Sequence, residues 1–169
     1  MKLYEPFDFL TDNQCNELID YAQDRIKPGA TLGKFTGRNN RVAWYEDSKY
    51  WSEWISIFNK IEPVIDWIQT PQIAFYRPGE HYDWHADTWP KYRTHIRHFT
   101  LTCELQSASG GKLELQDKSF SLKRGQAIIF KPGYFSFSAR INVSPEGYFW
   151  LRWSATNERS VIKRSKGSL

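Results

Sequence analysis

The chain has 169 residues and a mass of 20.0 kDa, which predicts a single domain. Hydrophobic residues make up 40% and aromatic residues 17%, which excludes intrinsic disorder as the main state, and no apolar run is long enough for a transmembrane helix. The formal net charge of +4 is too small to indicate nucleic-acid binding by itself.

The first predicted element is a helix over residues 11–27. Thr11 followed by Gln14 predicts a capping box at its start, and Pro28-Gly29 predicts its end. Its apolar residues follow the helical period: Cys15, Leu18, Ile19, Ala22 and Ile26.

Residues 30–46, rich in Gly and Asn, are predicted to be irregular. A second helical pattern runs from about Ser48 to Thr70-Pro71, and Pro63 is expected to kink or divide it. Its apolar residues again recur at three- and four-residue steps: Trp51, Trp54, Ile55, Phe58, Ile61, Ile65 and Ile68.

From residue 72 onward the pattern predicts short strands separated by turns. Helices followed by many strands, without alternation of the two, indicate an α+β fold. We expect one domain over residues 1–157, with a helical part at 1–71, a strand core at 72–157 and a basic tail at 158–169. The predicted strands are QIAFY, HIRHFTLTCEL, KLELQ, SFSL, QAIIF, FSFSARINV and YFWLRWSA.

The histidines form a tight group in the sequence. All four lie within residues 81–98, and the last 71 residues contain none. His85 and Asp87 form an H-x-D pair, and on a strand both side chains would face the same side. Such a pair can ligate one divalent metal ion, as in the two-histidine, one-carboxylate sites of non-haem Fe(II) oxygenases. A hydrogen bond that braces a strand is the structural alternative.

The stretch 72–87, QIAFYRPGEHYDWHAD, resembles the metal-ligand segment of the Fe(II)/2-oxoglutarate dioxygenases, in particular the prolyl-4-hydroxylase-like and PKHD-type hydroxylases. The resemblance covers about residues 72–155 and continues through Gly110-Gly111-Lys112-Leu113, the run from Gly125 to Phe130, and Trp153. The residues that match the pattern Y-x-P-G-x-x-Y-x-x-H-x-D are Tyr76, Pro78, Gly79, Tyr82, His85 and Asp87.

This resemblance implies a double-stranded β-helix (jelly-roll) core with the N-terminal helices packed on one sheet. It implies Fe(II) and 2-oxoglutarate as cofactors and hydroxylation as the reaction. His85 and Asp87 would be metal ligands, and Tyr76, Tyr82 and Arg97 would line the cosubstrate site.

Three positions depart from the family pattern. The late metal histidine would fall at Phe137, which has no donor atom, and the basic residue that pairs with the far carboxylate of 2-oxoglutarate would fall at Gly147. Arg152 and Arg140 are distant substitutes for that basic residue. Glu104 stands where a neutral group is common in the family, and an inward glutamate would repel the dianion. It could instead be a new counter-ion for Arg97 or His98.

We therefore expect an oxygenase-like protein that is inactive or atypical and uses its concave face for recognition. The alternative is an active dioxygenase, acting on a protein side chain or a small molecule, in which His98 or His95 supplies an unusual third ligand. A cupin-type metal hydrolase or isomerase is a third hypothesis, but it also lacks a third ligand.

Candidate residues for recognition surround the H-x-D pair. Trp84 and Trp89 flank it, and a loop carrying Lys34, Arg38 and Arg41 could meet an anionic substrate or simply be solvated. The substrate or partner stays open, and a membrane partner is not expected. Only two cysteines and no apolar signal core at the start favour a cytoplasmic protein with free, buried thiols.

Overall fold

A computed structural model describes residues 2–28, 39–61, 67–77, 80, 82, 97–106, 112–115, 118–131 and 148–156. For residues 67–68, 97–98 and 148–156 it describes the backbone alone. The predicted strand at 135–143 and the tail at 158–169 lie outside these residues.

Most of the described strands form one large antiparallel sheet. Its strand order is β1-β9-β6-β10-β5-β3-β2, and β4 also pairs with β10. Next to it lies a two-stranded sheet, β7-β8. The strands are β1 Phe7–Asp8, β2 Lys27–Pro28, β3 Arg41–Trp44, β4 Trp67–Ile68, β5 Gln72–Tyr76, β6 Arg97–Glu104, β7 Leu113–Leu115, β8 Lys118–Phe120, β9 Gln126–Phe130 and β10 Tyr148–Thr156.

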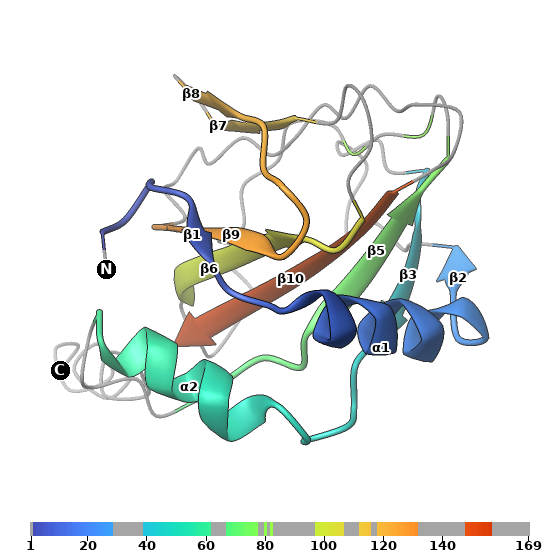
Figure 1. The fold of residues 1–169 in the computed structure, drawn as a ribbon, viewed down its shortest axis with the longest axis horizontal. Coiled ribbons are helices and arrows are strands. Elements are labelled where there is room, and N and C mark those ends of the chain that lie inside the picture. Colours follow the sequence, from blue (N-terminus) through green and yellow to red (C-terminus); the bar gives the residue numbers. More distant parts are fainter. Residues whose placement is uncertain are drawn as a thin grey trace, which may run out of the picture.

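The large sheet separates two hydrophobic clusters. Helices α1 (Asp12–Gln23) and α2 (Trp51–Asn59) cover one face, and the β7-β8 sheet lies over the opposite face, which we call the inner face (Figure 1). The helical side buries Leu18, Trp54, Phe58, Ile73, Leu101 and Ile129, among others, and the inner face buries Val42, Ala74, Tyr76, Leu113, Leu115, Leu122, Ile128 and Phe130. The predicted α+β class, with N-terminal helices on one sheet, is therefore present in the described residues.

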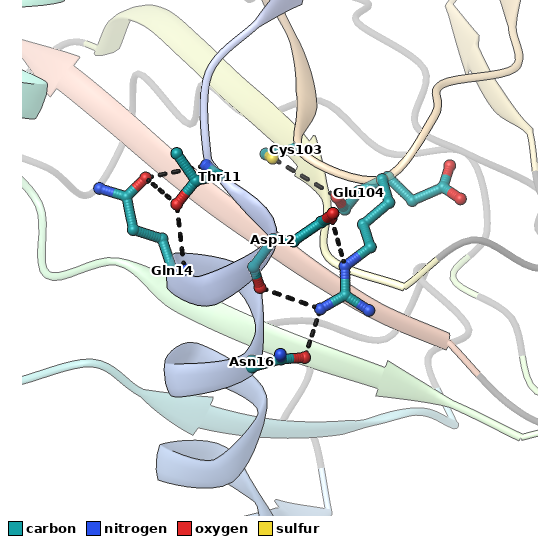
Figure 2. Close-up of polar contacts among 7 residues, drawn as sticks. Thr11, Asp12, Gln14, Asn16, Cys103 and Glu104 are labelled. Atoms are coloured by element: carbon teal, nitrogen blue, oxygen red, sulfur yellow. Dashed lines mark hydrogen bonds and ion pairs between the residues drawn. The ribbon is translucent and has the colours of Figure 1, made fainter.

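Helix α1 begins as the sequence predicts. Thr11 is its N-cap, the Thr11 hydroxyl accepts a hydrogen bond from the Gln14 backbone N–H, and the Gln14 side chain accepts one from the Thr11 backbone N–H. This reciprocal capping box satisfies two N–H groups that have no partner within the helix. Figure 2 shows these contacts at the start of the helix.

The ends of the predicted helices are wrong. Helix α1 ends at Gln23, not at residue 27, because Lys27 and Pro28 pair with Val42 and Arg41 of β3. The same pairing makes part of the predicted irregular region 30–46 a strand. Tertiary strand pairing overrides local helix propensity at these positions.

The second predicted helix is shorter than expected. Helix α2 ends at Asn59, before Pro63, and Trp67–Ile68 form the strand β4, which pairs with Thr156 and Ala155 of β10. Residues 62–66 lie outside the described residues. Ile68 is therefore a strand residue, although its spacing from Ile65 resembles a helix.

Tight backbone contacts at Gly125 join helix α1 to the large sheet. The Gly125 N–H donates to the Glu104 carbonyl at 2.8 Å, and the Gly125 carbonyl accepts from Phe9 and Leu10 at 2.9 and 3.0 Å. Gly125 has φ +76°, a conformation that glycine adopts without strain. The turn before β9 thus fixes the end of β6 and the chain that enters α1.

No helix in the described part of the chain has the length and hydrophobicity needed to span a membrane.

Candidate functional site

The interior strand β6 places a row of polar side chains on the inner face. Phe99, Leu101 and Cys103 of this strand belong to the cluster on the helical side. Because side chains alternate along a strand, the residues between them face the other way. These are Thr100, Thr102 and Glu104, all of which are buried.

Glu104 is the one buried acidic residue among the described residues. Only 2% of its surface is exposed, and it is the last residue of β6. Glu104 also has an interaction partner within the protein. A carboxylate at such a position makes this end of the inner face acidic unless a cation is paired with it.

Two tyrosines predicted to line the cosubstrate site lie on the inner face. Tyr76 is 5% exposed and ends β5, and Tyr82 is partly buried and packs against the same cluster. The structure therefore brings Tyr76 and Tyr82 to the face that carries Glu104. Their proposed cosubstrate contacts stay a prediction.

The strand register brings separate sequence motifs to one end of the sheet. Trp150 of β10 is paired with Glu104 on one side and with Ala74 on the other. Two residues earlier, Tyr148 is paired with Tyr76 and begins β10. Position 147, where the sequence pattern expects a basic residue, immediately precedes Tyr148 in the chain. Glu104 and the start of β10 are thus neighbours, although they are distant in sequence.

A hydrogen-bonded turn leaves β5 toward the predicted metal pair. The Glu80 carboxylate accepts from the Arg77 backbone N–H at 2.8 Å, and the Glu80 N–H donates to the Arg77 carbonyl at 2.9 Å. The other carboxylate oxygen of Glu80 lies 3.7 Å from a guanidinium nitrogen of Arg41 on β3. Arg41 was expected in a basic loop; it is instead a strand residue whose charge faces Glu80.

Most predicted metal ligands lie outside the described residues. His85, Asp87 and the alternative ligand His95 are among them. The replaced positions Phe137 and Gly147 and the candidate recognition residues Trp84, Trp89, Lys34 and Arg38 also lie outside the described residues. Within the described residues, no group of three metal-binding side chains occurs. Arg97 and His98 begin β6, and a register irregularity lies where Arg97 pairs with Thr156.

The two cysteines are buried and free, as the sequence predicts. Burial raises the pKa of the Cys103 thiol well above its usual value, and burial is also the main cause of the raised pKa of Cys15. The Cys103 thiol lies 3.6 Å from the Glu104 carbonyl (Figure 2). Neutral, buried thiols of this kind are unreactive, so neither cysteine is a catalytic nucleophile.

Sequence reasoning missed two polar contacts that join separate parts of the chain. One is the pair formed by Arg41 and Glu80. The other joins Arg124 to the start of α1, because its guanidinium contacts the Asp12 carboxylate at 3.1 Å and also donates to the Asn16 side chain. The turn sequence R-P-G-E predicts that Glu80 lies beside Arg77, since Pro and Gly favour a four-residue turn, but it gives no signal for the contact with Arg41.

Comparison with protein families and with curated proteins gives one family match. The model of the 2OG-Fe(II) oxygenase superfamily matches residues 71–157, which is about half of the chain. A search of curated proteins gave no match.

Several solved structures share the fold. A viral collagen prolyl hydroxylase from Paramecium Bursaria Chlorella virus-1, in complex with 2OG, is 21% identical, with a TM-score of 0.72 over 92% of this chain and 97% of the other. A prolyl-4-hydroxylase from Pseudomonas putida is 13% identical, with a TM-score of 0.68 over 90% and 91% of the two chains. A prolyl hydroxylase from Trichoplax adhaerens, in complex with a hypoxia inducible factor peptide fragment, is 15% identical, with a TM-score of 0.65 over 93% and 80%.

Proposed function

Because this chain belongs to the 2OG-Fe(II) oxygenase superfamily, we propose that it keeps the family's fold and inner face but does not carry out the ordinary oxygenase reaction. Family membership implies Fe(II) and 2-oxoglutarate as cofactors, in agreement with the motifs. The residues present do not fit this pair of cofactors. In this proposal the inner face serves recognition, and the fold is the family's double-stranded β-helix.

The distribution of histidines carries the proposal. An ordinary site needs two histidines and one carboxylate around one iron. The last 71 residues contain no histidine, so no shift of the late strands supplies the second one, and Phe137 stands at its position. His85 and Asp87 alone would hold a divalent ion weakly, because even changes outside the ligand set cost 10–100-fold in affinity.

The cosubstrate end of the inner face gives independent support. Gly147 replaces the basic residue that would pair with the far carboxylate of 2-oxoglutarate. Glu104, buried on the inner face, is paired in register two residues beyond the start of β10. One change removes a positive charge and the other adds a negative one, so both weaken the binding of a dianion.

The second candidate function is an active dioxygenase with His98 as third ligand. The observation that favours it is the position of His98 on β6, the interior strand that also carries Thr100, Thr102 and Glu104. Its substrate would be a protein side chain or a small molecule, because the fold alone does not distinguish between them.

Anaerobic titration with Fe(II) and 2-oxoglutarate separates the two functions. We expect no retention of iron after desalting, no visible absorption band on adding 2-oxoglutarate, and no conversion of 2-oxoglutarate to succinate once air is admitted. Stoichiometric iron together with succinate formation would establish the active dioxygenase. The same titration of a His98→Ala variant would then test the third ligand, with Thr100→Ala on the same strand as a matched control.

A further inference from the structure

We propose that the N-terminal turn Lys2–Glu5 is a latch, which holds the β7-β8 sheet against the large sheet when it is closed and which opens while the rest of the domain stays folded. Because the β7-β8 sheet lies over the inner face, the latch controls how firmly that face is covered (Figure 1). The inference goes beyond the proposed function and does not rest on it, because both candidate functions use the inner face.

The turn lies across the edge of the large sheet at β9 (Figure 1). The Tyr4 N–H donates to the Ile129 carbonyl at 2.9 Å, and the Tyr4 hydroxyl donates to the Lys131 carbonyl at 3.4 Å. Leu3 packs against the cluster on the helical side, whereas Tyr4 packs against the cluster of the inner face. Two neighbouring side chains of the turn thus contact the two opposite faces of the sheet at this edge.

Tyr4 also joins this edge to the small sheet. The Lys118 ammonium of β8 lies 5.5 Å from the centre of the Tyr4 ring, within the range of a cation–π contact. Lys118 is paired with Leu115 of β7, which is buried in the inner cluster, so both side chains leave the small sheet toward the large one. No strand pairing joins the two sheets in the described part of the chain, so within it the small sheet is held by side-chain packing and by Tyr4.

The contacts that close the latch are weak. Tyr4 is the one non-glycine residue with a positive φ among the described residues, at +63°, and a bulky side chain is strained in that conformation. Pro6 follows the turn and has no N–H with which to continue the pairing to β9. Lys118 is exposed, and the ion pair within the turn, Lys2–Glu5, has side chains that are 79% and 60% exposed. Because these contacts are few and exposed to water, we expect the turn to open locally, before the core unfolds.

Amide hydrogen exchange of the natural chain, followed by NMR, tests whether the latch opens alone. We expect the Tyr4 N–H to be protected, but to exchange at least 100-fold faster than the slowest amides of β6. Low concentrations of urea should leave its rate unchanged, because local opening exposes little surface. Exchange as slow and as urea-dependent as that of β6 would make the turn part of the global fold, and exchange without any protection would mean that the latch is not closed. Either result overturns the inference.

Two variants of Tyr4 test whether the latch holds the β7-β8 sheet. Tyr4→Ala removes the ring, whereas Tyr4→Phe keeps the ring and loses only the hydroxyl, so Tyr4→Phe is the matched control. The amides of β7 and β8 should exchange at least tenfold faster in Tyr4→Ala than in the natural chain, and within twofold of the natural rate in Tyr4→Phe. The amides of α1, on the opposite face of the large sheet, should keep their rates in both variants.

The effect has to be confined to the small sheet. If Tyr4→Ala accelerates exchange in α1 and β6 by the same factor, the substitution only lowers global stability, and if β7 and β8 keep their rates, Tyr4 does not hold that sheet; both results overturn the inference. If Tyr4→Ala does not fold, Lys118→Met decides, because it removes only the charge above the ring. It should accelerate exchange in β7 and β8 about threefold, and unchanged rates would overturn the inference.

Discussion

Gly125 is a residue whose backbone geometry does not accommodate a side chain without strain. With φ +76°, any side chain there is strained, and an added Cβ would lie 2.2 Å from the Leu10 carbonyl oxygen, which is a backbone atom. We expect Gly125→Ala to lower the free energy of unfolding by about 2–4 kcal/mol. Urea denaturation followed by tryptophan fluorescence measures this loss.

Lys123→Ala is the control for this substitution, because the Lys123 side chain in the same turn is exposed. Its effect should stay within about 0.5 kcal/mol. A Gly125→Ala protein as stable as Lys123→Ala would mean that the turn and the start of α1 do not approach each other as closely as described.

Tyr45 is a buried phenol that should make the protein sensitive to alkali. Burial is the largest cause that raises its pKa from 10.0 to about 12, and Asp47 adds to it. The unfolded chain therefore loses this proton at a lower pH than the folded chain, and stability should fall as the pH rises from 10 toward 12. Below pH 10 the phenol is neutral in both states and causes no change.

The variant Tyr45→Phe removes this group and keeps the ring that packs against Tyr21 and Trp54. Between pH 10 and 12 it should lose about 2 kcal/mol less stability than the natural chain, as a shift of this size implies. Urea unfolding at several values of pH measures the difference. If the free energy of unfolding fell equally steeply with pH in the two proteins, Tyr45 would be excluded as the titrating group.

At the scale of elements, the sequence predicts helices and strands best where the hydrophobic pattern is long. Helix α1 begins at its predicted cap, and β5 and β9 coincide with the predicted runs QIAFY and QAIIF. Lys27 of β2 and both residues of β4 were predicted as helix, because a two-residue strand shows no period and its state is decided by the partner strand. The strand β1 was missed for the same reason.

The turn after β5 is an element whose stability can be tested. Glu80 closes it through the Arg77 N–H and also faces Arg41. Glu80→Ala removes both contacts and should cost about 1–2 kcal/mol, whereas Glu80→Gln can still accept from Arg77 and should cost about half as much. Thermal and urea unfolding of both variants give these values.

The exposed pair Lys2–Glu5 provides a comparison for Glu80. Its side chains are 79% and 60% exposed, so Glu5→Gln should change stability by less than about 0.5 kcal/mol. If Glu80→Gln were as harmful as Glu80→Ala, the ion pair with Arg41 and not the hydrogen bond to Arg77 would hold the turn.

At the scale of the whole molecule, the sequence predicts which residues are candidates for the site better than it predicts which of them are neighbours in the fold. It singled out Tyr76, Tyr82 and Glu104, and the structure places all three on the inner face. It did not predict that Glu104 lies beside the start of β10, because a strand register depends on pairing across the sheet. The sequence also did not predict the contact of Arg41 with Glu80, since it joins β3 to the turn after β5.

The alignment of the late strands is tested by restoring the two missing groups. In Phe137→His with Gly147→Arg, the imidazole would add a metal ligand and the guanidinium would pair with the far carboxylate of 2-oxoglutarate. Because one cosubstrate would then be held at both ends, metal and cosubstrate affinities should rise together, each more than tenfold. Calorimetry with Mn(II), with and without 2-oxoglutarate, measures both.

The control moves the new histidine by one residue, as Ser136→His with Gly147→Arg. On a strand, adjacent side chains face opposite sides, so this variant should gain no metal affinity. If the Phe137 and Ser136 variants both stay as weak as the natural chain, residue 137 does not occupy the late ligand position. The assignment of Gly147 to the basic position would then have to be revised as well, because both assignments derive from the same alignment.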